Sequence, residues 1–306
     1  MPLAIYTFAL TALTLLIYRC SKIGRRPAGY PPGPPTLPLL GNLHQMPKEK
    51  AHVQFQKWAE TYGPVYSLML GTKVMIVLNT DVAVKDLLDR RSGIYSSRPD
   101  MYIANMASGG LRFSLLEYGD LWRKVRKVVH NTLNINAVQA YIPYQDLENR
   151  AMLVRLLEQP DQFIDIVRLY ANSLTTQMIF GYRTTSTEDP RFKQFFHGFE
   201  KLSKLLNAGT AAIIDFYPIL RSLPDALVPL RRYAKRLHKA EVDLYVGHWL
   251  DTKRRIQEGT ASPSFCVDLA RAQKEEGWSD LLAGYSSGVL LEAGSDTTSS
   301  TLIGCS

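Results

Sequence analysis

The chain has 306 residues, of which 46% are hydrophobic, and its formal net charge is +8. This length allows one large domain or two, and the apolar content is ample for a buried core. Basic chains can bind nucleic acid, but here the basic residues are spread along the chain without any nucleic-acid-binding signature. We therefore expect no nucleic acid partner; a membrane surface or an acidic protein partner explains the charge better.

Residues 1–18 form an uncharged, mostly apolar run. As a helix this run would be about 27 Å long, enough to cross the hydrocarbon core of a bilayer. Arg19, Lys22, Arg25 and Arg26 follow at once, and such a basic stop places the rest of the chain in the cytosol. The alternative is a cleaved signal peptide, which would carry its basic residues before the apolar run. We expect a retained single-pass transmembrane anchor.

Residues 19–42 combine the basic stop with a proline-rich stretch, YPPGPPTLPLLGN. Proline fixes φ and resists helix formation, so the stretch predicts a stiff, extended spacer. Such strings also occur as ligands of peptide-binding domains. The position just after the predicted anchor favours a hinge, with residues 43–306 forming the body of the protein.

The first elements of the body predict a helix and a small sheet. Residues 51–62 have amphipathic helical spacing, and residues 65–70 and 74–78 flank a glycine-containing turn, which predicts a β-hairpin. Asp81 can cap a helix that runs to about residue 91.

Residues 101–118 contain two adjacent glycines and no clean period, so we expect a long loop, and long loops in compact domains tend to be functional. The helix predicted next carries Trp122 and Arg126, which are four residues apart and so lie on one face. A basic helix face is usually just solvated. A tryptophan and an arginine together can also grip an anionic group such as a carboxylate.

The remainder is expected to be mainly helical, with Ser279 and Asp280 capping the final helix. Helices are expected within 144–180 with a break at 159–160, and over 192–206, 231–256 and 268–276. Loops are expected at 184–190 and 259–263, and a loop or short helices at 208–229. The predicted fold class is mainly α with a small N-terminal β-sheet.

The final helix contains the stretch AGSDTTSS at residues 293–300. Glycine, an acid and a row of hydroxyls are poor helix formers, and serine or threonine can bond the carbonyl four residues back. One interpretation is a notch that handles oxygen, with Asp296 and Thr297 as a proton relay. The other is a glycine- and serine-rich turn or a frayed helix end.

Taken together, these features resemble microsomal cytochrome P450 monooxygenases. The anchor, the PPGPPTLPLLGN hinge, the Trp122-x-x-x-Arg126 helix and the Ala293-Gly-x-Asp-Thr-Thr298 motif occur in the family's order over almost the whole chain. The WxxxR pattern alone is weak, whereas the ordered combination is specific. The general character is closest to fungal members of secondary metabolism.

The resemblance implies haem as the cofactor. Trp122 and Arg126 would then bond a haem propionate, and Ala293 and Gly294 would leave room for oxygen above the ring.

The resemblance also implies that Asp296 and Thr297 deliver protons to iron-bound oxygen. It further implies a small lipophilic substrate, an NADPH-dependent flavoprotein reductase as partner, and a location in the endoplasmic reticulum membrane with the body facing the cytosol.

The chain departs from the family in its cysteines. Members hold the haem iron with a thiolate from a Phe-x-x-Gly-x-Arg-x-Cys-x-Gly loop downstream of the oxygen-binding helix, and this sequence contains no such loop. Its three cysteines, Cys20, Cys266 and Cys305, lie outside that context and are spaced too widely for a zinc site. We therefore expect no metal ligand among them.

The sequence thus resembles a family member truncated after the oxygen-binding helix, and we expect this chain to be inactive. Two alternatives stay open. An active monooxygenase would have a true chain that continues beyond Ser306, and a non-catalytic, membrane-tethered interaction protein would need no haem.

Overall fold

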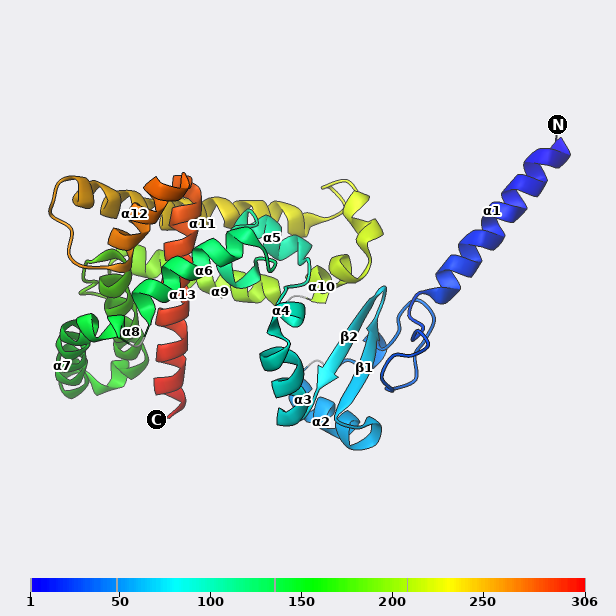
Figure 1. The fold of residues 1–306 in the computed structure, drawn as a ribbon, viewed down its shortest axis with the longest axis horizontal. Helices are drawn as coiled ribbons and strands as arrows, with labels where there is room; N and C mark the ends of the chain where they lie inside the picture. The colour runs from blue at the N-terminus through cyan, green and yellow to red at the C-terminus, as the bar shows by residue number, and fades with distance from the viewer. Residues whose placement is uncertain (1, 48, 135, 208, 306) are drawn as a thin grey trace. The chain divides into compact units, whose positions relative to one another are not determined.

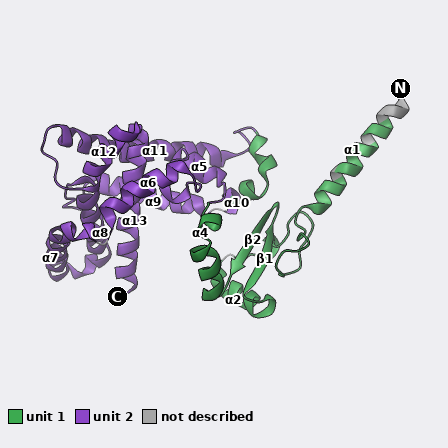
Figure 2. Cartoon of the chain, viewed as in Figure 1, with its two compact units in different colours: residues 1–97, 212–223 green, residues 98–211, 224–306 purple. Residues whose placement is uncertain are grey.

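The computed structural model describes residues 2–47, 49–134, 136–207 and 209–305, without the side chains of residues 2–5, 9 and 16. It divides into two compact units, residues 1–97 with 212–223 and residues 98–211 with 224–306 (Figure 2). Within the described residues the only strands form one hairpin in the first unit, and helices make up most of the rest (Figure 1). The predicted class, mainly α with a small N-terminal sheet, is confirmed. The predicted division at residues 18 and 42 does not coincide with this split and stays a prediction.

The first unit contains the hairpin of β1 (Val65–Leu70) and β2 (Lys73–Leu78). Pairing is antiparallel, with Val65 opposite Leu78 and Leu70 opposite Lys73. The hairpin is confirmed, although β2 begins one residue earlier than expected. Gly71 in the turn has φ +60°, and a Cβ there would lie 2.8 Å from the ring of Tyr217. The turn therefore requires glycine both for its conformation and for space.

Short helices make up the other elements described with the first unit. They are α2 (Ala51–Tyr62), η1 (Leu43–Gln45), α3 (Asp81–Val84), the π-helical η2 (Lys85–Arg90), α4 (Ser92–Tyr95), η6 (Pro218–Ser222) and α10 (Gly209–Phe216), the last crossing the boundary between the units. The helix expected from residue 81 to 91 is observed as α3 followed directly by η2. Its cap is Thr80, because the Thr80 backbone is extended and its hydroxyl accepts the amide of Ala83 at 3.3 Å.

The proline-rich segment is bonded along β1 instead of forming a free spacer. Arg26 Nε donates to Ser67 Oγ at 2.8 Å, and the Ser67 amide donates to the carbonyl of Pro32 at 2.8 Å. The Asn42 side chain accepts the amide of Met69 at 2.8 Å. Prolines lack an amide but keep their carbonyls, so the segment can accept hydrogen bonds from the strand edge.

The N-terminal run forms the helix α1 (Pro2–Lys22), in agreement with the expected helix. The predicted anchor spans residues 1–18, of which residue 1 and the side chains of residues 2–5, 9 and 16 lie outside the described part of the chain. Among those that are described, no helix is both long and apolar enough to cross a membrane. The predicted transmembrane anchor is not confirmed.

The second unit is a bundle of helices around α13. Its elements are α5 (Tyr102–Ser108), η3 (Phe113–Leu115), α6 (Asp120–Leu133), η4 (Ala137–Tyr141), α7 (Ile142–Glu158), η5 (Pro160–Gln162), α8 (Phe163–Phe180), α9 (Pro190–Leu206), α11 (Pro229–Gln257), α12 (Phe265–Glu276) and α13 (Asp280–Gly304). The break at Pro160 and the cap by Ser279, whose Oγ accepts the amide of Leu282 at 3.1 Å, are as predicted. The expected loop at 101–118 instead contains α5 and η3.

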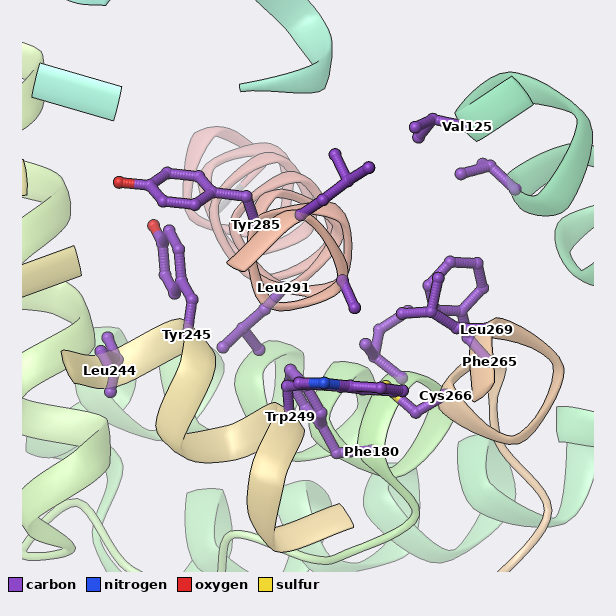
Figure 3. Packing of buried hydrophobic residues seen from close by; sticks show 14 of the residues in the cluster. Val125, Phe180, Leu244, Tyr245, Trp249, Phe265, Cys266, Leu269, Tyr285 and Leu291 are labelled. Atoms are coloured by element: carbon purple, nitrogen blue, oxygen red, sulfur yellow. The ribbon is translucent and has the colours of Figure 1, made fainter. Parts of the chain in front are cut away.

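The core of this unit lies where α8, α11 and α13 pack together. Large side chains from several helices meet there, among them Phe180, Tyr245, Trp249, Phe265, Tyr285 and Leu291 (Figure 3). Two glycines four residues apart on α13 permit the close approach of α11. A Cβ on Gly284 would lie 2.9 Å from Val246 Cα, and one on Gly288 would lie 2.2 Å from Tyr245 Cγ. Small residues at this spacing let two helix backbones approach each other.

Candidate functional site

Residues 293–300, the predicted oxygen-handling stretch, lie within a continuous helix, because α13 extends through Gly304. Its hydroxyls bond back to the helix itself. Thr297 Oγ1 donates to the carbonyl of Ala293 at 2.6 Å, and Thr301 Oγ1 donates to the carbonyl of Thr297 at 2.8 Å. These bonds satisfy the polar side chains without breaking the helix. The interpretation as a turn or frayed end is therefore wrong for residues 293–300.

The motif has one face packed and one face open. Ser295 is buried, and its Oγ accepts a hydrogen bond from Asn172 Nδ2 of α8 at 3.3 Å. Ala293 and Thr297, one turn apart, are exposed, and Asp296 is half-buried. In the described part of the chain, no side chain bonds the Asp296 carboxylate. The open face thus offers a small residue, a hydroxyl and an unpaired acid side by side.

Gly294 lies on the packed side of α13. A Cβ there would lie 2.6 Å from Thr175 Oγ1 and 2.7 Å from Thr175 Cγ2 on α8. The approach of these two helices is by itself sufficient reason for a glycine at this position. The role expected from the resemblance, room for oxygen, stays a prediction.

Trp122 and Arg126 lie on α6, as the spacing predicts. Trp122 is half-buried and stacks on Phe113, with ring centroids 6.0 Å apart and planes at 11°. Its other ring neighbour is Tyr118, at 5.2 Å. Arg126 is exposed. Across the residues that the structure describes, neither the indole N–H nor the Arg126 guanidinium has a hydrogen-bond partner, so both donors are available to a ligand.

No hydrogen bond, ion pair or ring contact joins Trp122 or Arg126 directly to residues 293–298 in the described part of the molecule. The two halves of the candidate site meet through the segment between α5 and α6. Arg112 in that segment pairs with Glu292, which directly precedes Ala293. Phe113, the next residue, stacks on Trp122.

The sequence analysis missed the buried ion cluster around Arg112. Arg112 NH2 donates to Glu241 Oε1 of α11 at 2.7 Å, and its NH1 donates to Glu292 Oε2. The three side chains are at most 9% exposed. One signal was available: Glu292 is a lone acid at the end of an apolar run, and a buried acid requires a partner.

Burial is the largest influence on the pKa of Glu241, the buried acid of α11. It raises the pKa of Glu241 to about 7 despite the attraction of Arg112, and the nearby Glu292 raises it further. One arginine cannot balance two carboxylates, so one of them holds a proton more tightly than usual. Burial together with Glu292 likewise raises the pKa of Tyr245 well above its ordinary value. The Tyr245 hydroxyl therefore remains a donor to Glu292.

The cysteines occupy three different settings. Cys20 is half-buried, Cys266 is buried and Cys305 is exposed, and all three are free thiols. Cys266 lies in the core beside Phe265 and Leu269, and burial raises the pKa of its thiol. A thiol in this setting stays protonated and is a poor ligand.

A family model for cytochrome P450 matches residues 31–303. Three curated relatives are described as cytochrome P450 monooxygenases: fogE of Aspergillus ruber, 54% identical over 296 residues, virE of Hypocrea virens, 53% over 305, and fsoB of Humicola fuscoatra, 47% over 295. The alignments cover 96%, 99% and 96% of this chain and 55% of each relative. The chain thus spans about half the length of the curated relatives it matches. These relatives give no support to the expected loss of activity.

Proposed function

Because the chain belongs to the cytochrome P450 family, we propose that the protein acts as a haem-dependent monooxygenase on a small lipophilic substrate of fungal secondary metabolism. Identity of 54% to a fungal monooxygenase supports this proposal. The chain spans 55% of that relative, so the activity of the whole protein is part of the proposal.

The observation that carries the proposal is the pair of free donors on α6. The family binds haem, whose propionates are carboxylates. Trp122 and Arg126 lie on one helix face, and neither has a hydrogen-bond partner among the described residues. A charged, planar guanidinium and an indole N–H are suited to a carboxylate, and charge-assisted hydrogen bonds are the strong ones. The residues present therefore fit one edge of the cofactor.

The open face of α13 fits the flat side of the cofactor. Ala293 presents a methyl group, which leaves a planar ring free to approach the helix, and Thr297 stands one turn further along. When bound, haem supplies the redox chemistry that activates O₂ for insertion of one oxygen atom.

Asp296 and Thr297 would handle protons next to that face. The Thr297 hydroxyl donates to the Ala293 carbonyl, which orients its oxygen lone pairs away from the helix axis as acceptors. The Asp296 carboxylate is half-buried and unpaired among the described side chains, so it can take a proton from solvent and pass it on.

A flavoprotein reductase that draws electrons from NADPH is the proposed partner. The exposed basic residues of α6 support this part of the proposal, because an acidic partner is attracted to such a surface. Lys124 is already paired with Glu276 at 2.6 Å, whereas Arg126 and Lys127 are exposed and have no partner among the described residues.

The test is a carbon monoxide spectrum of the purified, reduced protein after expression with added haem. A haem absorbance band that shifts when carbon monoxide binds would support the proposed enzyme. Protein that folds but takes up no haem would contradict it, and would favour a non-catalytic interaction protein instead.

A further inference from the structure

A buried arginine ties the segment before α6 to two helices. Arg112 is 4% exposed, and its two terminal nitrogens reach different helices: NH2 donates to Glu241 on α11 at 2.7 Å and NH1 to Glu292 on α13. Removing one partner from a buried ion pair leaves an uncompensated charge, which is strongly unfavourable. The position of Arg112 therefore follows the positions of α11 and α13.

The two carboxylates are themselves fixed. The Tyr285 hydroxyl donates to Glu241 Oε2 at 3.2 Å, and the Tyr245 hydroxyl donates to Glu292 Oε1. All four carboxylate oxygens thus accept a hydrogen bond. The two tyrosine rings also meet edge to face, with centroids 5.6 Å apart (Figure 3). Hydrogen bonds to all four oxygens restrict the two carboxylates to one arrangement, although Arg112 Nε itself is buried without a partner among the described residues.

The rigidity of this network extends to Trp122 through two aromatic rings. Phe113 follows Arg112 directly and stacks on the indole. Phe113 begins the short helix η3, in which the Leu115 amide donates a hydrogen bond to the Arg112 carbonyl at 2.9 Å. Tyr118, at the other end of the same segment, contacts the indole at 5.2 Å. The indole has no hydrogen bond of its own in the described part of the chain, so these rings set its place.

We propose that Arg112 is a positioning residue for Trp122. By bridging Glu241 and Glu292 it holds Phe113 against the indole, so that Trp122 and Arg126 present their N–H groups to one anionic group. The inference rests on the proposed function, since that group is a haem propionate. The guanidinium fork is required because the two acids lie on different helices, and a lysine ammonium has no such fork.

The test compares R112K with R183K in the full chain labelled with 5-fluorotryptophan. Arg183 makes the same kind of pair elsewhere in the unit, with its Nε 2.5 Å from Oε1 of the buried Glu148. A Trp122→Phe variant identifies the ¹⁹F resonance of Trp122. Spectra are recorded with and without haem, and haem affinity is measured by titration.

In R112K we expect the Trp122 resonance to shift by more than its line width, already without haem, and haem affinity to fall about tenfold. R183K leaves both unchanged. A second variant, Phe113→Leu, keeps the ion cluster and removes the stacking ring, and it should displace the Trp122 resonance and weaken haem in the same way.

An unshifted Trp122 resonance in R112K would overturn the inference, and so would a shift without loss of haem affinity. Failure of the wild-type chain to bind any haem would contradict the proposed function instead. The two failures are distinguishable because the haem-free spectra report the position of Trp122 alone.

Discussion

Arg112 and Arg126 lie in the same unit of the molecule in opposite environments. Arg112 is 4% exposed, and both of its terminal nitrogens donate hydrogen bonds to buried carboxylates. Arg126 is exposed and bonds nothing among the described residues. An arginine whose partners come from its own chain holds the fold, whereas one without such partners is available to a ligand. Arg126, the predicted binding residue, is of the second kind, and Arg112, the proposed positioning residue for Trp122, is of the first.

The largest effect should come from removing the buried arginine. Arg112→Met leaves Glu241 and Glu292 buried around an apolar side chain, and we expect it to lower the free energy of unfolding by about 3–5 kcal/mol. Arg126→Met should change it by no more than about 0.5 kcal/mol, as is usual for an exposed site. Urea unfolding followed by circular dichroism measures both. Similar losses in the two variants would contradict the distinction.

The same cluster should give stability a specific pH dependence. The folded state raises the pKa of Glu241 from 4.5 to about 7, so it binds this proton more tightly than the unfolded chain does. The contribution to stability is complete below about pH 4.5 and is lost as the pH rises to 7, with a slope of at most about 1.4 kcal/mol per pH unit. Urea midpoints between pH 5 and 8 measure it, with Glu241→Gln as control. Equal slopes in the two proteins would show that Glu241 is not the group responsible.

Two glycine-to-alanine variants in the second unit should change the free energy of unfolding in opposite directions. Gly288→Ala places a Cβ 2.2 Å from Tyr245 Cγ and should cost about 1–3 kcal/mol by overpacking. Gly198→Ala meets no atom within 4 Å on α9, so it should stabilise by about 0.5–1 kcal/mol through helix propensity. Thermal unfolding distinguishes them, and a stabilising Gly288→Ala would refute the close approach of α11 and α13.

The smallest effect on stability is expected on the open face of α13. Asp296→Asn and Thr297→Val alter side chains that make no bond to another helix in the described structure, so each should change the unfolding free energy by no more than about 0.5 kcal/mol. Denaturant unfolding is the measurement. A loss above 1 kcal/mol in either variant would assign that residue to the fold and weaken its assignment to function.

The sequence predicted what local chemistry decides. The hairpin follows from two apolar strands around Gly71, the break before α8 follows from Pro160, and the start of α13 follows from the cap at Ser279. Trp122 and Arg126 share a helix face because they are four residues apart. In each case the cause lies within a few residues of the effect.

What the sequence could not predict depends on distant contacts. Arg112 meets Glu241 and Glu292 across 129 and 180 residues of chain, and no periodicity reveals such a pairing. Gly294 was assigned to oxygen by resemblance, although its neighbour is Thr175 on a helix more than a hundred residues earlier. Both depend on how helices pack, which residue spacing alone does not specify.

Haem titration of the purified chain tests the central claim most directly. We expect saturable binding in the wild type, followed by its absorbance, with affinity about tenfold lower in Arg126→Ala because one charge-assisted hydrogen bond is lost. Lys127→Ala, which removes an exposed basic residue of the same helix without a partner among the described residues, should bind as the wild type does. Equal affinity in the Arg126→Ala protein, or no saturable binding in the wild type, would contradict the assignment of Trp122 and Arg126 as haem-binding residues.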